Sequence, residues 1–388
     1  MNDRLLRPDA AIISTIFTES QPTFIEILAN SFTNCTFKAG FDQRPAVIVR
    51  LDTSSGLLAV VAAIQKAASL QISTFVPEIL TSGEATTADG RAVEYTITRF
   101  VSETVTLESV WPSPSLAQKT NLIDAVANTL DKLRQFDTSH ALAQQVLSNT
   151  PLIQSGEKVG IGGPSIGFAK DIFGLIMLFV AKHQSKSFAT SFVTDTLDGN
   201  GIIIRSALPE LSEIHLSAHD LDVLKESVVL SHNDLEPRNL LVKREESKDG
   251  PQYELAAIID WEMAGLYSSS FETAVKDISL GNCNQYLDWY LMFKERTRAI
   301  IFGEEAPEKL VKAVHLIAES RTRQQTMGVS AEIRRRWIVR EDLKLSDNVL
   351  EGWMPKTIGD SVKRVSRPFS KEDNDELEQQ VLKDLGKI

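Results

Sequence analysis

Cysteine is scarce in this 388-residue chain, and its two cysteines, Cys35 and Cys283, stand far apart. Their number and spacing exclude a disulfide-stapled fold and favour free thiols in a reducing compartment. The longest apolar run, 172–181, is far shorter than the ~20 residues that a membrane-spanning helix requires. The first ten residues carry acids where a signal peptide would be apolar. We therefore expect a cytoplasmic protein with no membrane partner.

Positive charge is in deficit as well. The chain has 41 Lys and Arg against 52 Asp and Glu, which gives a formal net charge of −11. Binding to nucleic acid depends on clustered Lys and Arg that neutralise phosphates, so no nucleic-acid partner is expected. The apolar fraction of 43% and the charged fraction of 24% are those of an ordinary globular protein that buries a sizeable core.

Two regions of the chain differ in secondary-structure pattern. Residues 45–52 and 92–101 are dense in β-branched side chains, which predicts strands. The Ala- and Leu-rich residues 56–70 predict a helix whose N-cap is Ser54 or Ser55. Beyond residue 102 the pattern is mainly helical. One apolar face at helical spacing is made of Leu122, Val126, Leu130 and Leu133. The sequence therefore predicts an α+β fold whose first part is β-rich.

The stretch LSHNDLEPRNLLV, residues 230–242, places polar side chains between apolar runs. It leads into two strand-like runs joined by the polar residues EESKDGPQ, which predicts a hairpin. Antiparallel pairing returns the chain to its starting end. Asp234 and Asn239 before the hairpin and Asp260 after it are therefore expected to converge. Their carboxylate and amide oxygens suit Mg²⁺, which usually keeps phosphates among its other ligands.

The spacing His-x-Asp-x-x-x-x-Asn, followed by a strand-borne Asp, is the catalytic-loop and metal-site layout of kinases. The segments SHNDLEPRNLLV and AAIIDWEMAG resemble the aminoglycoside phosphotransferase and choline kinase-like family, particularly its broad fungal membership. In that family the two motifs read His-Gly-Asp and Ile-Asp-Trp-Glu. The resemblance spans about residues 25–345, strongly at 230–262 and loosely elsewhere. It implies a two-lobed protein-kinase-like fold.

The resemblance also implies roles for the residues of the two motifs. Asp234 is expected to be the catalytic base that orients the acceptor hydroxyl. Asn239 and Asp260 are expected to hold Mg²⁺, and His232 is expected to be structural. Asn233 replaces the family glycine, and asparagine is among the residues that best tolerate a left-handed backbone.

The first lobe is expected to bind ATP. Arg50, in the strand AVIVR, stands where the family has a lysine that contacts the phosphates, and an arginine presents a bidentate fork instead of a point charge. Backbone groups near residues 98–101 are expected to meet the adenine. The residues assigned to the nucleotide are Arg50, Ser31, Asn34, Thr98, Phe100 and Val101.

This lobe departs from the family pattern in two ways. No glycine precedes Gly40, so a Gly-x-Gly-x-x-Gly cover is absent, and a looser turn over 31–34 is placed there instead. Neither Asp nor Glu occurs between residues 53 and 77, so the usual helix carboxylate that pairs with the strand cation is missing. Gln65 is then the neutral substitute, or Arg50 depends on the nucleotide alone.

Simpler interpretations remain for several side chains. A lone His-x-Asp is more often a hydrogen-bonded turn, and only the rest of the constellation favours catalysis. Trp261 is expected in the core. Glu262 is either a second acid near the site or a helix cap. Arg238 and Glu236 are expected to pair on the surface without a chemical role.

The expected division of the chain is a nucleotide-binding lobe over 1–101, a helical lobe over 102–354 and a charged C-terminal tail over 355–388. In the second lobe the catalytic loop occupies 230–242 and the metal-binding Asp260 lies on 253–262. The resemblance assigns 141–225 to the acceptor pocket. That segment holds eight acids and six Lys or Arg, a balance that gives no sign of a pocket for polycationic aminoglycosides.

Three functions follow from this reading. The leading one is an ATP- and Mg²⁺-dependent kinase that phosphorylates a hydroxyl of a small molecule. The second is a pseudokinase-type binding or scaffold protein with a weakened nucleotide site, which the missing helix acid favours and the intact Asp234, Asn239 and Asp260 disfavour. The third uses the same metal site for nucleotidyl transfer or carboxylate activation. The sequence does not separate the first from the third.

Overall fold

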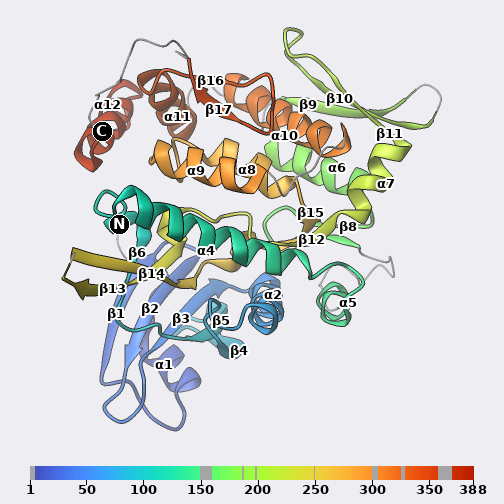
Figure 1. Cartoon of the computed structure of the whole chain (residues 1–388). Helices are drawn as coiled ribbons and strands as arrows, with labels where there is room; N and C mark the ends of the chain where they lie inside the picture. Colours follow the sequence, from blue (N-terminus) through green and yellow to red (C-terminus); the bar gives the residue numbers. More distant parts are fainter. Residues whose placement is uncertain are drawn as a thin grey trace.

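The computed structural model describes residues 5–148, 160–185, 188–196, 199–248, 250–298, 305–324, 328–356 and 369–388. They form a β-rich N-terminal lobe, at the bottom of Figure 1, and a larger, mainly helical C-terminal lobe above it. The two-lobed α+β class expected from the sequence is confirmed. No helix in these ranges combines the length and the apolarity needed to cross a membrane.

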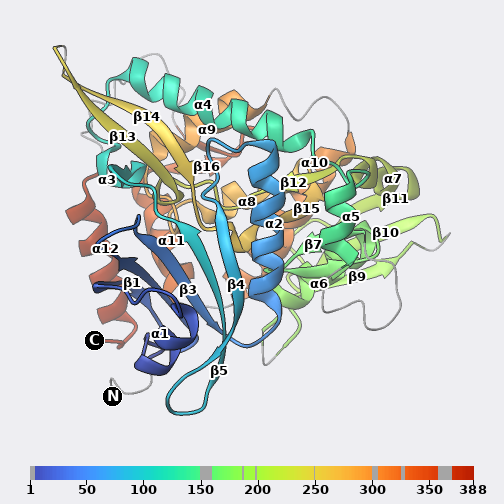
Figure 2. The same cartoon turned by 90° about the horizontal axis from the view of Figure 1, so that it is seen from below.

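The N-terminal lobe is built on a five-stranded antiparallel sheet in the order β1-β2-β3-β5-β4. Its strands are β1 (Phe24–Asn30), β2 (Asn34–Gly40), β3 (Val47–Thr53), β4 (Ile79–Thr86) and β5 (Ala92–Arg99). Helix α1 (Ala10–Ile16) covers one face of the sheet. Helix α2 (Leu57–Gln71), where the sequence predicts a helix, packs against β4 and β5 (Figure 2).

Alternation along β3 separates the two faces of this sheet. Val49 and Leu51 are fully buried in a small core with Phe37 and Ile12. Arg50 lies between them in sequence, so its side chain leaves the opposite face, toward the C-terminal lobe. The strand pattern thus aims the only cation of AVIVR into the space between the lobes.

The start of α2 differs from the prediction. Its N-cap is Gly56, which has a left-handed backbone with φ of 74°. The buried Glu94 carboxylate, on β5, accepts hydrogen bonds from the backbone N–H groups of Ser55, Gly56 and Leu58. A carboxylate there satisfies free N–H groups and complements the helix dipole. The predicted N-cap at Ser54 or Ser55 is therefore wrong, because the Glu94 carboxylate of strand β5 accepts the hydrogen bonds that a capping side chain would accept.

The chain enters the C-terminal lobe through β6 (Thr104–Thr106), α3 (Leu107–Val110) and α4 (Leu116–Arg134). Helix α4 begins with a capping box formed by Ser115 and Gln118. It crosses Figure 1 between the sheet and the helices above it. The predicted apolar face is confirmed, because its four members are buried: Leu122, Val126, Leu130 and Leu133.

The segment between α4 and β12 (Val228–Ser231) mixes short strands and helices. Its elements are α5 (Ala141–Ser148), β7 (Ile161–Gly163), β8 (Gly167–Ala169), α6 (Ile172–His183), β9 (Ser191–Asp195), β10 (Gly201–Ser206), β11 (Ile214–Ser217) and α7 (Ala218–Glu226). Strands β9–β11 form a separate antiparallel sheet in the order β11-β10-β9. Strands β7 and β8 join β12 and β15 in a four-stranded sheet.

The predicted hairpin is present, with longer strands than expected. After β12 (Val228–Ser231) and the short 3₁₀ helix η3 (Pro237–Asn239), β13 (Leu240–Ser247) pairs with β14 (Gly250–Ile258). The second 3₁₀ helix, η4 (Trp261–Met263), and β15 (Gly265–Ser268) follow. Strand β6 pairs with the outer side of β13, so the link between the lobes is hydrogen-bonded to the β13–β14 hairpin.

The remaining helices are α8 (Phe271–Ser279), α9 (Leu287–Arg298), α10 (Glu305–Gln324), α11 (Val329–Arg340) and α12 (Lys371–Asp384), with β16 (Leu343–Leu345) and β17 (Trp353–Pro355) between α11 and α12. Helix α12 opens with the expected capping box of Ser370 and Asp373. Its Val381 is fully buried, and Arg336 of α11 bonds Asp384 at 2.7 Å. Within the predicted tail, α12 is thus packed on α11, and residues 357–368 lie outside the described ranges.

Candidate active site

The hairpin brings the two motifs to one end, as its antiparallel pairing requires. Leu240 is the cross-strand partner of Ile258, and the backbone N–H of Ile259 donates to the carbonyl of Asn239 at 2.9 Å. Asn239 and Asp260 therefore leave the same end of the ladder. The expected convergence of these polar residues is observed.

Asp234 lies at the centre of a hydrogen-bonded loop. Its Oδ2 accepts from Asn239 Nδ2 at 2.7 Å and from Arg238 Nη2 at 2.9 Å, and only 9% of its side chain is exposed. The amide of Asn239 also donates to the Asp234 carbonyl at 2.8 Å. Arg238 was expected to pair with Glu236, and that prediction is wrong. Arg238, four residues after Asp234, lies beside it because the chain turns in the 3₁₀ helix that begins at Pro237.

His232 has the structural role expected of it. It is fully buried, its Nδ1 accepts from the backbone N–H of Asp234 at 3.2 Å, and its Nε2 lies 3.1 Å from the carbonyl of Ile259. A ring that accepts at Nδ1 and donates at Nε2 is neutral. Burial lowers the pKa of His232 to about 4, which agrees with that form. The ring meets buried Trp261 edge to face, so Trp261 is core, as predicted.

The residue between His232 and Asp234 shows why this loop accepts asparagine. Asn233 has a left-handed backbone with φ of 61°, as the replacement of glycine predicts. Its N–H donates to Glu272 Oε1 and its side-chain Nδ2 to the carbonyl of Met263, both at 3.1 Å. These bonds tie the loop that carries Asp234 to α8 and to the loop after Asp260.

A buried ion pair between Lys276 and Glu236 anchors the loop that carries Asp234 to helix α8. Lys276 of α8 donates to the carbonyl of Leu235 and to Glu236 Oε1, the latter at 3.0 Å. Both side chains are at most 2% exposed. Burial raises the pKa of Glu236, and the Lys276 ammonium opposes that rise. The surface pairing expected for Glu236 is therefore wrong. Sequence reasoning missed this anchor because the two residues are far apart in the chain and only packing brings them together.

Arg50 joins the two lobes. Its Nη1 donates to Asp260 Oδ1 at 3.3 Å, its Nη2 pairs with Glu262, and Asp52 lies at 3.7 Å. The cation that lacks a helix acid thus finds carboxylates on the loop after the hairpin. Gln65 does not take the place of the missing acid: the Arg50 guanidinium pairs with Asp52, Asp260 and Glu262, and Gln65 Nε2 donates to the carbonyl of Pro77 at 2.7 Å. Glu262 is an acid beside the site and makes no capping bond.

Acidic charge is concentrated around Asp260. Burial and then the nearby Glu262 raise the pKa of Asp260 to about 6, while the charge of Arg50 opposes that rise. Asp260 also has a left-handed backbone, with φ of 64°. A non-glycine residue held in that region is often strained for a functional reason. A cation bound beside Asp260 would therefore offset the repulsion between its carboxylate and that of Glu262.

The donor set fits a hard cation. Both bonds of Asn239 Nδ2 go to Asp234, so the side chain presents its oxygen, Oδ1, for other contacts. Asp260 adds a carboxylate at the same end of the hairpin. Within the described ranges, no group of three or more His, Cys, Asp and Glu forms a complete metal site. Mg²⁺ commonly takes one or two carboxylates and draws further ligands from phosphates and water, which this set permits.

The residues assigned to the nucleotide occupy one face and one end of the N-terminal sheet. The cross-strand register pairs Asn34 with Asp52 and Ile48 with Thr98, which places Asn34 and Thr98 on the face of Arg50. Ser31 closes the β1–β2 turn by accepting from the N–H of Asn34 at 3.0 Å. No contact in the described ranges identifies a bound nucleotide, so these assignments remain predictions.

Two further nucleotide assignments follow the end of β5. The ring of Phe100 is covered by the ammonium of Lys38, 4.1 Å from its centroid. The carbonyl of Val101 accepts from Thr104 Oγ1 at 2.9 Å. That carbonyl is already engaged within the link between the lobes. The contacts of Phe100 and Val101 with an adenine therefore remain predictions.

No family model matches the chain, and no curated protein matches it. Among solved structures it is similar to the GDP and kanamycin complex of APH(2")-IIia, with 15% identity and a TM-score of 0.43, over 84% of this chain and 93% of that one. It is similar to the amicoumacin kinase hAmiN in complex with AMP-PNP, Ca²⁺ and Ami, with 11% identity and a TM-score of 0.45, over 86% and 94%. A macrolide 2'-phosphotransferase type I matches at 11% identity and a TM-score of 0.40, over 86% and 97%. At this identity and TM-score the likeness carries no argument about chemistry, which has to be argued from the residues of this chain.

Proposed function

We propose that this protein is an ATP-dependent phosphotransferase of the aminoglycoside phosphotransferase and choline kinase-like type, which phosphorylates a hydroxyl of a small molecule. One observation carries the proposal. Asp234, Asn239 and Asp260 meet at one end of the β13–β14 hairpin, and Arg50 reaches the same place from the N-terminal sheet. A base, two oxygen ligands and a phosphate-binding cation in that layout suit phosphoryl transfer.

Asp234 is the catalytic base in this proposal. Its carboxylate takes the proton of the acceptor hydroxyl as the new O–P bond forms to the γ-phosphorus, while the bond from that phosphorus to the β–γ bridging oxygen breaks and ADP leaves. Arg238 and Asn239 hold the carboxylate by hydrogen bonds at 2.9 and 2.7 Å. Positioning of this kind supplies much of the rate enhancement in phosphoryl transfer.

Asn239 and Asp260 would hold Mg²⁺, which when bound neutralises phosphate charge. Arg50 would then exchange part of its contact with Asp260 and Glu262 for the phosphates of ATP. Its guanidinium already lies between the sheet and the hairpin. The residues on the same sheet face and at its end, among them Thr98 and Phe100, would contact the nucleotide base.

A second function, a pseudokinase-type binding protein, is favoured by one observation. Arg50 is paired with Asp260, which would hold the metal, and with Glu262, while the helix after β3 has no acid that could pair with it instead. If that pairing persists in solution, it fills the phosphate position and nucleotide binding weakens. No feature of the described residues favours nucleotidyl transfer over phosphoryl transfer.

The test compares wild type with Asp234→Asn in Mg²⁺ and ATP. The variant keeps the shape and loses the charge that accepts the proton, so ADP formation should fall by ~10²–10⁴-fold while ATP affinity changes little. Asp222→Asn, at an exposed acid of α7, is the matched control and should match wild type.

Three other outcomes would contradict parts of this proposal. Equal ADP formation by wild type and Asp234→Asn would remove Asp234 from catalysis. Wild type that forms no ADP, and phosphorylates nothing in an extract of hydroxylated metabolites, would favour the pseudokinase. Release of AMP and pyrophosphate would favour nucleotidyl transfer or carboxylate activation.

A further inference from the structure

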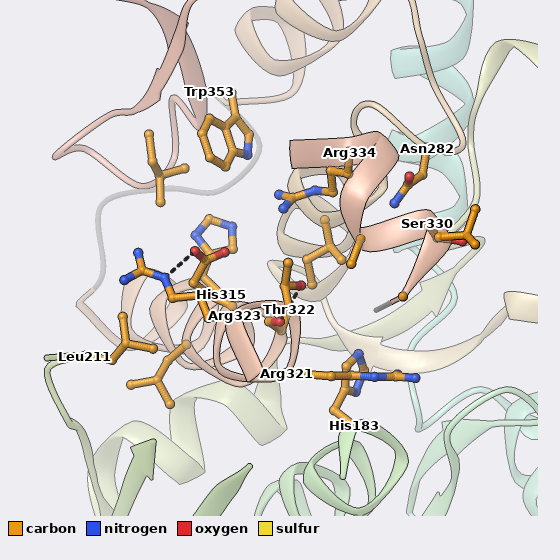
Figure 3. A pocket seen from close by; sticks show the side chains of 18 residues that line it. His183, Leu211, Asn282, His315, Arg321, Thr322, Arg323, Ser330, Arg334 and Trp353 are labelled. Carbon is orange, nitrogen blue, oxygen red and sulfur yellow. Dashed lines mark hydrogen bonds and ion pairs between the residues drawn. The ribbon is translucent and has the colours of Figure 1, made fainter. Parts of the chain in front are cut away.

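A cavity of about 630 Å³ lies in the C-terminal lobe, lined by α10, the start of α11, the end of α6 and Trp353 of β17 (Figure 3). Its size is within the range of small-molecule sites. In Figure 3 the side chains of Arg334, Arg321, His183 and His315 surround the space, and Trp353 lies at one side. Apolar residues including Ile278 complete the wall.

The lining carries an excess of positive charge. Three arginines line the cavity against one acid, Glu319, and that acid is bonded to Arg323 at 2.8 Å. Arg334 is joined to no carboxylate by an ion pair within the described ranges; its Nη2 donates only to the backbone carbonyl of Asp277, at 3.2 Å. Its Nε is buried and has no hydrogen-bond partner among the same residues. A desolvated N–H of this kind costs free energy unless something accepts from it.

The one buried acid near Arg334 is already neutralised. The Asp277 carboxylate accepts from Lys294 at 3.0 Å, from His315 Nε2 at 2.9 Å and from the Tyr290 hydroxyl. His315 in turn keeps its Nδ1 buried without a partner in the described part of the chain. Asp277 therefore forms no ion pair with Arg334, and the Nε of Arg334 is a buried donor on the cavity wall without a hydrogen-bond partner among the described residues.

Two residues of the cavity wall are chain neighbours of residues that interact with the candidate active site. Asn282, on its wall, is next to Cys283, whose thiol interacts with Arg238, the partner of Asp234. His183, also on the wall, follows Lys182. Burial lowers the pKa of Lys182, the charge of Arg321 lowers it further, and Glu262 opposes both. Through these chain neighbours the cavity wall is connected to groups that interact with Arg238 and Glu262.

We propose that this cavity binds an anionic group of the acceptor, a carboxylate or a phosphate monoester, with Arg334 on the anion and Trp353 against the body of the molecule. The identification of the ligand as the acceptor rests on the proposed kinase function; the anion site itself does not. Guanidinium groups bind carboxylate and phosphate through paired hydrogen bonds. The indole, over which the Arg334 guanidinium lies at 5.3 Å, offers an apolar surface beside that charge.

The first experiment measures binding without ATP. Benzoate, phenyl phosphate and the uncharged benzyl alcohol are titrated into wild type by calorimetry. At least one anion should bind, and benzyl alcohol should bind about tenfold more weakly or not at all, because a charge-assisted hydrogen bond contributes on that order. The stronger of the two anions identifies the carboxylate or the phosphate as the preferred group. Equal binding of benzyl alcohol, or no binding of either anion, would overturn the proposal.

The second experiment removes the cation. Arg334→Gln should lose about tenfold or more in anion affinity. Arg335→Gln, at the next and exposed position of α11, should keep it. If Arg334→Gln does not fold, Arg334→Lys keeps the charge without the planar fork and should still weaken binding. Anion affinity that is unchanged in a folded Arg334 variant would overturn the assignment.

Turnover then separates this inference from the proposed function. If wild type forms ADP and phosphorylates neutral polyols as well as hydroxy acids and phosphorylated alcohols, the kinase stands and the anionic acceptor is refuted. If anions bind through Arg334 and no ADP forms, the anion site stands and the kinase is refuted. A preference for anionic acceptors that Arg334→Gln abolishes, through a higher KM, supports both.

Discussion

Replacing Lys276 by methionine tests how much the buried Lys276–Glu236 ion pair stabilises the protein and the loop that carries Asp234. Lys276 and Glu236 are 3.0 Å apart and almost fully buried. Methionine keeps an apolar chain of similar length and removes the ammonium. Breaking a buried pair by removing one partner leaves an uncompensated charge, which costs about 3–5 kcal/mol. Because domains are commonly stable by about 5–15 kcal/mol, the variant should fold with a much reduced margin.

The measurement is urea unfolding followed by circular dichroism, with the midpoint and the slope compared between proteins. The double variant Glu236→Leu/Lys276→Met removes both charges, so it should regain much of the stability. It should still lack about 1–3 kcal/mol, because the Leu235 carbonyl loses its donor. Lys312→Met, in an exposed pair with Glu308 at 3.9 Å, is the control and should change stability by less than about 0.5 kcal/mol.

A loss in Lys276→Met no larger than in Lys312→Met would show that the anchor is not formed in solution. A double variant as unstable as the single one would show that charge burial is not the cause. In both cases the account of how α8 positions Asp234 would have to be abandoned.

Two other predictions concern the metal site and the buried histidine. Asp260→Ala should abolish the thermal stabilisation that Mg²⁺ with ATP gives to wild type, since a ligand stabilises only the state that binds it; equal stabilisation of both proteins would remove Asp260 from the site. His232, with a pKa lowered to about 4 in the folded protein, binds a proton more readily when unfolded, so folding stability should fall as pH drops from about 6.5 to about 4, by up to about 3 kcal/mol. His232→Gln should flatten that part of the stability–pH curve, whereas replacement of exposed His219 by glutamine should not; parallel curves for wild type and His232→Gln would contradict the assignment.

The local pattern of the sequence was sufficient for the elements that present the site. Helical spacing identified the buried face of α4, and alternation in β3 implied that Arg50 leaves the sheet opposite Val49 and Leu51. The left-handed backbone of Asn233 followed from its place in the motif. These features depend on neighbours a few residues away, so periodicity and residue type determine them.

Pairing between distant segments was decided only in the tertiary structure. The sequence shows that the helix after Arg50 lacks an acid, but not that Asp260 and Glu262 take its place. It likewise does not show that Glu236 turns inward to Lys276, or that Glu94 caps α2. A buried charged group needs a partner that compensates the free-energy cost of its desolvation, and the packing of distant segments decides which residue that partner is. The motif therefore predicted which groups would do the chemistry, and the packing of α8, β5 and the two lobes decided what holds them.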